Sequence, residues 1–120
     1  MTQNVTDLVK RYLAIWNQTQ PAARRAAIEA LYENECTYTD PIADVRGHDG
    51  IDAMIAAVQK AYPGIVFELD GAVDGHHDQA RFTWSAGFPG APAAVVGFDV
   101  AVFRDGRIQH VFGFLDKAPA

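Results

Sequence analysis

The sequence predicts an α+β fold in which three helices precede a run of antiparallel strands. Two observations support this prediction: apolar residues recur with helical spacing over much of the first 62 positions, and from Val66 onward they alternate as in strands. Successive strands joined by short turns pair antiparallel, so we expect the helices on one side of the sheet. The length of 120 residues suits one domain, and we expect residues 1–120 to form it.

Three amphipathic segments account for the expected helices. Apolar side chains at three- and four-residue steps predict a first helix over residues 5–16. The second helix is expected over residues 22–32, with Thr19 as its cap. The third follows Gly47 and ends at Tyr62, where proline and glycine come next.

The remaining segments are typical of strands separated by turn residues. A short strand is expected before Pro41, which cannot donate to a ladder hydrogen bond. The last two strands form a hairpin closed at Asp105 and Gly106. We expect strands at residues 36–40, 66–73, 80–86, 93–103 and 107–115, with residues 74–78 as a connection and 87–92 as a loop.

The composition excludes several classes of protein. Hydrophobic residues make up 49% of the chain, enough for a buried core, which excludes a disordered or disulfide-scaffold protein. Ten Lys and Arg against fifteen Asp and Glu give a net charge of -5, which disfavours nucleic acid or an anionic membrane as a partner. Cys36 is the single cysteine, so no disulfide forms within the chain. The first residues lack a signal-peptide pattern and no 18-residue apolar run occurs, so we expect a cytoplasmic protein.

Asp99 interrupts an otherwise apolar strand. It is the single polar residue in the segment from Val95 to Phe103. An ionised carboxylate in such surroundings is strongly disfavoured, so it must be paired, hydrogen-bonded or kept neutral by a raised pKa. One interpretation is a role in the chemistry of the protein. The other is a position near a strand end, where the side chain caps a neighbouring loop.

Both faces of this strand are apolar. The even-numbered residues from Val96 to Val102 form one face, and the odd-numbered residues from Val95 to Phe103 form the other. An antiparallel sheet with one face in water would carry polar residues there, so both faces need cover. Three helices can cover one face, and we expect a second copy of the chain to cover the other, giving a homodimer through the sheet.

The sequence leaves the register of the last hairpin open. A two-residue turn places Phe112 opposite Asp99 and puts His110 on the same face, whereas a three-residue loop places Val111 there and sends His110 to the other face. His110 is therefore either a partner of Asp99 or a residue of the dimer interface.

Two further residues are candidates for chemistry. Asp40 lies at the end of a short strand, where a carboxylate also commonly forms a turn or a cap. Tyr12 lies in the buried stripe of the first helix; a buried phenol usually has a partner for its hydroxyl, although core packing alone also explains it. His76 and His77 are adjacent and would point to opposite sides of a strand, so we interpret them as part of a solvated turn and expect no metal.

A series of short motifs runs through the chain. They are Arg11-Tyr12, Leu31-Tyr32, Tyr38-Thr-Asp-Pro41, Arg46-Gly47, Asp99-Val-Ala-Val-Phe103 and Asp105-Gly-Arg-Ile-Gln109. In order and spacing they resemble ketosteroid isomerase and, more broadly, the nuclear transport factor 2-like superfamily, which includes the SnoaL-like polyketide cyclases. The resemblance implies a cone-shaped barrel, in which a curved, mostly antiparallel sheet wraps around three helices. It also implies an apolar pocket at one end and, commonly, dimerisation through the sheet.

The resemblance implies roles for individual residues and no cofactor. Asp40 matches the general base of the isomerase, Tyr12 and Asp99 match its two oxyanion-hole donors, and Tyr32 matches a tyrosine that supports the phenol network. Asp99 can donate a hydrogen bond only while protonated, and an apolar strand favours that form. A tyrosine of the third helix in the isomerase is replaced here by isoleucine. We expect the pocket to be lined by Trp16, Tyr32, Met54, Ile55, Phe82, Trp84, Val111 and Leu115.

Three functions are compatible with these residues. The leading one is cofactor-free proton transfer on a small hydrophobic carbonyl compound, as isomerisation or aldol-type ring closure. The second is a non-catalytic domain that binds a hydrophobic small molecule or another protein on the same fold. The third is activation of water by paired carboxylates, as in the limonene epoxide hydrolases. It needs an arginine between the two acids, and the nearest, Arg81, lies on the strand face opposite Phe82 and Trp84.

Overall fold

Three helices and one seven-stranded sheet make up the computed structural model, which describes residues 4–118. The helices are α1 (Val5–Asn17), α2 (Pro21–Leu31) and α3 (Gly47–Ala61). The strands are β1 (Tyr32–Thr39), β2 (Asp44–Arg46), β3 (Val66–Leu69), β4 (Asp74–His76), β5 (Gln79–Gly87), β6 (Val95–Arg104) and β7 (Arg107–Lys117).

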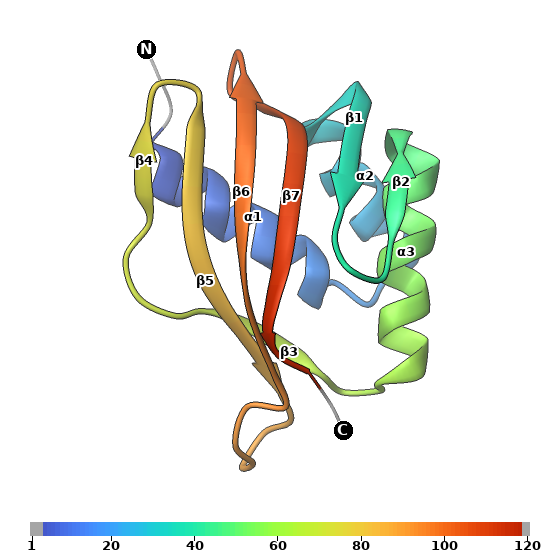
Figure 1. Ribbon diagram of the computed structural model, residues 1–120. Coiled ribbons are helices and arrows are strands. Elements are labelled where there is room, and N and C mark those ends of the chain that lie inside the picture. Colours follow the sequence, from blue (N-terminus) through green and yellow to red (C-terminus); the bar gives the residue numbers. More distant parts are fainter. Residues whose placement is uncertain (1–3, 119–120) are drawn as a thin grey trace.

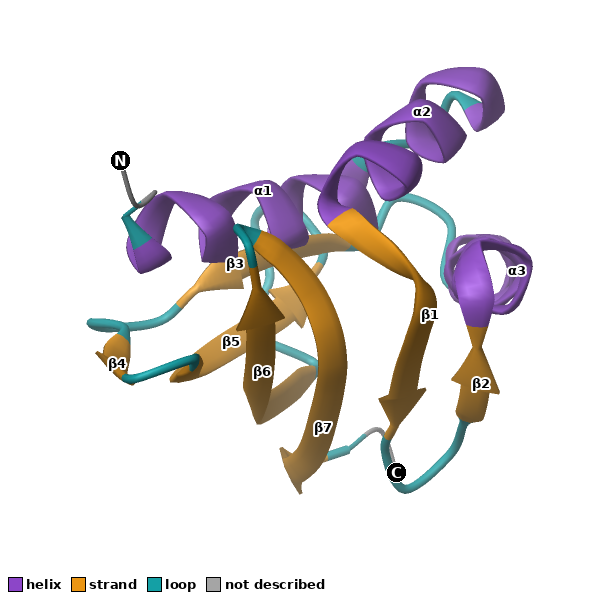
Figure 2. Ribbon diagram, turned by 90° about the horizontal axis from the view of Figure 1, so that it is seen from above, coloured by secondary structure: helices purple, strands orange, loops and turns teal. Residues whose placement is uncertain are grey.

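The sheet is curved, mostly antiparallel and open. Its strand order is β2-β1-β7-β6-β5-β3, with β4 paired to β5, and β1 runs parallel to β7. Helices α1 and α2 cover one face, and α3 lies at the flank beside β1 and β2 (Figures 1 and 2). The predicted α+β fold is confirmed, but the sheet does not close into a barrel, because β2 and β3 lie at opposite ends of the strand order.

The second helix differs from expectation at both ends. Its N-cap is Gln20 rather than Thr19, because the Gln20 side chain accepts a hydrogen bond from the amide of Ala23 at 2.6 Å. The helix ends at Leu31, and Tyr32 already pairs with β7 as the first residue of β1. The chain therefore passes from helix to strand without a loop.

Several strands also differ from the sequence prediction: β1 spans Tyr32–Thr39 rather than residues 36–40, and β2 was not expected. The segment expected as one strand over residues 66–73 ends at Leu69, two residues before Gly71, which has a φ of 92°. Residues 74–76, expected as a connection, form the short strand β4, because they pair with the start of β5. The polar Asp74-Gly75-His76 segment gives no strand signal of its own, so only its pairing reveals it.

The β6–β7 hairpin adopts neither register considered above. Residues 105–106 form a two-residue turn in which both have positive φ, 54° and 75°. A bulge after the turn then shifts the pairing by one residue, so Gly113 lies opposite Asp99, where Phe112 or Val111 was expected. A small residue thus faces the carboxyl across the strand pair.

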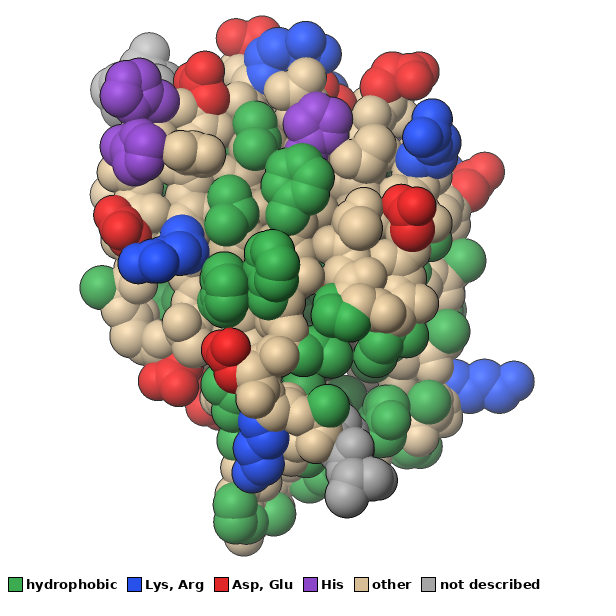
Figure 3. Space-filling model, viewed as in Figure 1, with side chains coloured by type: hydrophobic (Ala, Val, Ile, Leu, Met, Phe, Trp, Pro, Cys, Tyr) green, Lys and Arg blue, Asp and Glu red, His purple; other side chains and the backbone are tan. Residues whose placement is uncertain are grey.

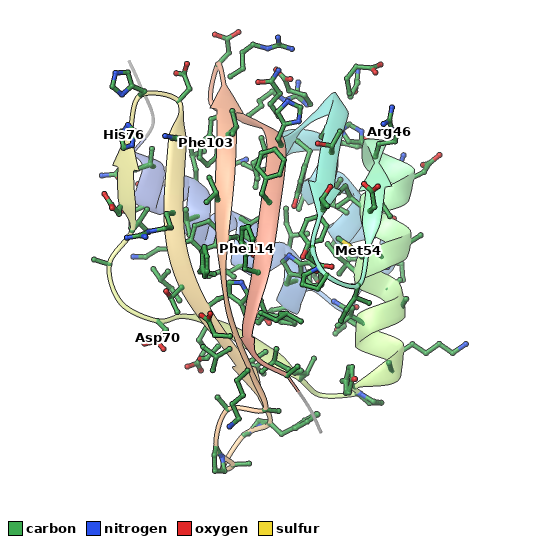
Figure 4. All side chains as sticks on the ribbon, in the orientation of Figure 1. Arg46, Met54, Asp70, His76, Phe103 and Phe114 are labelled. Atoms are coloured by element: carbon green, nitrogen blue, oxygen red, sulfur yellow. The ribbon has the colours of Figure 1, made fainter. Side chains whose placement is uncertain are left out.

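The shifted register places His110 on the outer face of the sheet. Its Nδ1 shares a hydrogen bond of 2.7 Å with Oγ1 of Thr37, so His110 is not a partner of Asp99. Around it the outer face is apolar, as the patch of hydrophobic side chains in Figure 3 shows. Phe114, labelled in Figure 4, belongs to this face and stacks on Phe98 with ring centroids 4.9 Å apart. The two predicted faces of β6 are confirmed, with the even-numbered residues 96–102 half-buried on this side.

Candidate active site

Asp99 lies in the middle of β6, on the inner face of the sheet, and is 2% exposed. The hydroxyl of Tyr12 in α1, equally buried, donates a hydrogen bond of 2.7 Å to its Oδ2. The other carboxyl oxygen, Oδ1, has no hydrogen-bond partner among the described residues. Asp99 is therefore neither near a strand end nor a loop cap, and it faces the phenol of the first helix.

Burial raises the pKa of Asp99 to about 6. The hydrogen bond from Tyr12 and the indole of Trp84 favour the carboxylate and limit this rise, while the negative charge of Asp40 adds to it. The indole Nε1 of Trp84 is itself buried without a hydrogen-bond partner in the described part of the chain. The indole N–H therefore stabilises the Asp99 carboxylate from nearby, without a well-aligned hydrogen bond to it. Burial also raises the pKa of Tyr12 well above 10, with the charge of Asp99 contributing. Below pH 6, both groups of the pair therefore hold protons.

A second tyrosine–carboxylate pair forms at the end of β1. Asp40 Oδ1 accepts hydrogen bonds from the amides of Ile42 and Ala43 at 2.8 and 2.7 Å, which closes the turn after the strand. Its Oδ2 accepts one from the hydroxyl of Tyr38 at 2.7 Å. Burial, the charge of Asp99 and the bond to Asp40 raise the pKa of the Tyr38 phenol far above its usual range, so it remains a donor. Asp40 thus forms the turn that its position suggested and is also held in a fixed orientation.

Gly113 lies between the two pairs. A Cβ atom at this position would stand 2.8 Å from Asp99 Oδ1, 3.1 Å from Asp40 Cβ and 3.6 Å from the Tyr38 hydroxyl. Real Cβ atoms essentially never approach as closely as 2.8 Å, so a larger residue would force these side chains apart. The absence of a side chain at Gly113 therefore allows both acids to share one site. Gly113 and Tyr38 were not among the predicted site residues, although Tyr38 stands in the motif that contains Asp40; the glycine facing Asp99 becomes a signal only once the register is known.

The two pairs line one cavity of about 110 Å³. Its other walls come from aromatic and aliphatic side chains of α1, α3, β3, β5, β6 and β7. Ile42, which is 84% exposed, and the half-exposed Tyr62 lie at its opening to solvent. The arrangement can therefore bind a small apolar molecule with hydrogen-bonding groups on two sides.

Three of the predicted pocket residues line the cavity: Trp16, Trp84 and Leu115. The others lie outside its lining. Tyr32, Ile55, Phe82 and Val111 are fully buried in the core, and Met54 of α3 is half-buried against it (Figure 4). The rings of Phe82 and Tyr32 pack near Tyr12, with centroids 5.5 and 6.5 Å from it. The Tyr32 hydroxyl has no hydrogen-bond partner among the described residues, so Tyr32 supports Tyr12 by packing and not through the hydrogen-bond network that the resemblance implied. Phe67, Val58 and Tyr62 also line the cavity and were not expected, because their own segments show ordinary core patterns.

The described residues include no group of three His, Cys, Asp or Glu side chains placed as metal ligands would be. His76 ends β4 and His77 begins the exposed turn after it, with their Nδ1 atoms 2.9 Å apart. Arg81 is exposed and lies 3.6 Å from Asp74, far from an arrangement in which it could bridge Asp40 and Asp99. No helix within residues 4–118 has the length and apolar character needed to cross a membrane.

Solved structures of two nuclear transport factor 2-like proteins, 10% and 18% identical to this chain, show the same fold, with TM-scores of 0.72 and 0.71. The sequence profile of the SnoaL-like domain matches residues 9–111, and the chain belongs to this family. It is similar to a candidate isomerase of the SnoaL-like family from Agrobacterium tumefaciens, with 38% identity, 97% of this chain and 99% of that chain covered, and a TM-score of 0.89. No curated protein sequence matches the chain.

Two more distant structures share the fold. One is a candidate polyketide cyclase from Sinorhizobium meliloti, 22% identical over 89% of this chain and 93% of that chain, with a TM-score of 0.70. The other is a candidate ketosteroid isomerase from Kribbella flavida, 17% identical over 95% of this chain and 78% of that chain, also with a TM-score of 0.70. The SnoaL-like family expected from the motifs is therefore confirmed, and the more distant structures show the same fold.

Proposed function

We propose that the protein is a cofactor-free enzyme that moves a proton on a small hydrophobic carbonyl compound, by double-bond isomerisation or aldol-type ring closure. The observation that carries this proposal is the buried Asp99, hydrogen-bonded to Tyr12 at 2.7 Å in the cavity that Asp40 also lines. Buried titratable groups with shifted pKa values in an apolar cavity are typical of catalytic sites. The names of the A. tumefaciens and S. meliloti structures agree with this class of reaction.

In this mechanism the carbonyl oxygen of the substrate lies at Tyr12 and protonated Asp99. Asp40 removes a proton from the carbon beside the carbonyl, and the electron pair moves onto that oxygen, where the two donors stabilise the charge. In an isomerisation, Asp40 then returns the same proton to a more distant carbon, so nothing is consumed. In a ring closure, the carbanion attacks a second carbonyl and the new alkoxide takes up the proton.

Tyr38 and the turn amides have a supporting role in this scheme. They bond Asp40 on both oxygens, at 2.7 to 2.8 Å, and so fix the plane of the carboxylate relative to the substrate. Such positioning reduces the entropy lost on reaching the transition state.

The test is the isomerisation of cyclohex-3-enone to its conjugated isomer, followed by ultraviolet absorbance. We expect turnover by the wild-type protein, loss of turnover in Asp40→Asn, and at least a 100-fold lower kcat in Asp99→Leu. Asp78→Asn, in the loop between β4 and β5, is the matched control and should leave the rate unchanged. Wild-type rates in Asp99→Leu would refute the oxyanion-hole role of this residue.

A non-catalytic binding domain is the alternative supported by the same cavity. It predicts that hydrophobic carbonyl compounds bind while none of a panel of enones is converted. Water activation by paired carboxylates finds no support, because Arg81 lies outside the cavity lining.

The outer face of the sheet suits a second copy of the chain. Phe112 and Phe114 are 42% and 51% exposed there, next to the half-buried valines of β6. A two-fold axis would place this apolar patch against itself. Sedimentation at micromolar concentration should show a dimer for the wild type and a monomer for Phe114→Asp. A monomeric wild type would overturn this part of the proposal.

A further inference from the structure

We infer that the substrate is a neutral molecule with a single ring or a short chain, and that an aromatic wall formed by Trp16, Phe67 and Trp84 imposes this limit. The inference rests on the proposed function and adds the substrate class to it. The cavity sets two limits on the ligand, one on its size and one on its charge.

The size limit follows from the cavity volume of about 110 Å³. Pockets for drug-sized ligands commonly measure roughly 300–1,000 Å³. An engineered cavity of about 150 Å³ is sufficient for benzene. The cavity therefore holds a molecule of about one six-membered ring, and a fused ring system would have to displace the wall or project through the opening at Ile42 and Tyr62.

The aromatic wall is continuous across three elements. The ring of Phe67 in β3 packs against Trp16 of α1 and Trp84 of β5, with centroids 5.1 and 5.6 Å away. Trp16 in turn packs against Tyr38 at 6.0 Å, which joins the wall to the tyrosine that holds Asp40. All four rings are buried and line the cavity. Indole and phenyl groups therefore close this side of the cavity to a second fused ring.

Several contacts hold the wall in place. The side chain of Asn17 bonds both the amide and the carbonyl of Phe67, each at 2.8 Å, and so ties β3 to the end of α1. Gln59 donates a hydrogen bond of 2.9 Å to the carbonyl of Trp16. The indole of Trp84 lies so close to Gly97 that a Cβ there would stand 2.7 Å from it. The backbone bonds fix the elements that carry Phe67 and Trp16, and the close packing of the rings against one another limits their rotation.

The charge limit follows from the polar groups of the cavity. Its ionisable groups are the carboxyls of Asp40 and Asp99 and the phenols of the tyrosines, and no Lys, Arg or His of the described residues lines it. An anionic ligand would meet negative charge without a compensating cation, and this is strongly disfavoured in an apolar site. A neutral carbonyl compound avoids this electrostatic cost. Negative charge then develops only during the reaction, on the carbonyl oxygen, where Tyr12 and Asp99 donate hydrogen bonds to it.

The test uses phenol, 2-naphthol and estradiol, which carry the same hydroxyl on one, two and four fused rings. Their binding is measured at pH 5 by quenching of tryptophan fluorescence and by calorimetry. We expect the wild type to bind phenol, to bind 2-naphthol at least 10-fold more weakly, and not to bind estradiol.

Trp84→Ala should strengthen 2-naphthol binding at least 10-fold. Phe67→Leu, a milder change in case Trp84→Ala does not fold, should shift the preference in the same direction. Phe88→Ala, at an exposed ring outside the cavity lining, should leave the order unchanged.

The outcomes separate this inference from the proposed function. If all three compounds bind the wild type with similar affinity, or the larger ones bind better, the size limit is wrong while the oxyanion site stands. If phenol binding does not depend on Asp99, tested with Asp99→Leu, the proposed site itself fails. A preference for 4-hydroxybenzoate over 4-methylphenol would overturn the requirement for a neutral ligand.

Discussion

Replacing Asp99 by asparagine should change the pH dependence of folding in a predictable way. In the folded protein burial raises the pKa of this carboxyl to about 6, against an ordinary value of 3.8. Asparagine has nearly the same shape and does not titrate. The difference in unfolding free energy between wild type and Asp99→Asn therefore isolates this one group from all other titrating side chains.

The sign follows from the direction of the shift. Between about pH 4 and pH 6 the folded protein keeps the proton of Asp99 while the unfolded chain has released it, so wild-type stability falls as the pH rises. The gap between 3.8 and about 6 corresponds to about 3 kcal/mol, at about 1.4 kcal/mol per pKa unit. The contribution is fully present below pH 4, is lost between pH 4 and 6, and stays absent above that.

Urea unfolding of both proteins at pH 4, 5, 6, 7 and 8 provides the measurement. We expect the wild type to lose about 3 kcal/mol relative to Asp99→Asn between pH 4 and pH 7, and no further change at pH 8. A constant difference over the whole range would show that Asp99 titrates as an ordinary carboxyl. The reasoning about the site would then fail, even if both proteins fold equally well.

Three further predictions concern single residues. Tyr12→Phe removes the hydroxyl that donates to Asp99 Oδ2 and should lower the free energy of unfolding by about 1–3 kcal/mol at pH 8. Because that hydrogen bond lowers the pKa of Asp99, its loss should raise this pKa, and phenol binding should persist to higher pH. An unchanged pH midpoint of phenol binding would contradict this. Gly113→Ala should lower the free energy of unfolding by about 1–3 kcal/mol and abolish phenol binding, since its Cβ would collide with Asp99. Tight phenol binding by this variant would argue against a site shared by the two acids. Arg24→Met leaves Asp52 without its 2.7 Å ion pair and should lower the free energy of unfolding, measured with urea, by about 3 kcal/mol. An unchanged free energy of unfolding would show that the ion pair is dispensable.

Much of the candidate site could be predicted because its signals are local. A carboxylate within an apolar strand and a tyrosine within a buried helical stripe are visible in the sequence, and the structure brings Asp99 and Tyr12 together. The same periodicity located all three helices, with errors at the ends of α2 where a glutamine replaces the expected threonine as cap. These features depend mainly on neighbours along the chain.

The features that were missed depend on partners distant in sequence. Tyr38 is the exception: it lies two residues before Asp40, whose carboxylate it bonds, so the alternation of the strand could have indicated it. Gly113 faces Asp99 only because a bulge shifts the hairpin register by one residue. The strand β4 is too short and polar to be recognised before its partner is known. Turn type fixes the start of a hairpin, but packing decides where the bulge falls.

The edges of the open sheet affect how the protein associates. The terminal strands β2, β3 and β4 have only three, four and three residues, and they carry charged side chains such as Asp44, Glu68 and Asp74. Short, charged edges offer few free backbone groups to an incoming strand, and so discourage growth into fibres. In the proposed dimer, a two-fold axis closes the contact between the two outer faces within one pair, so this contact leaves no apolar face for further copies to add.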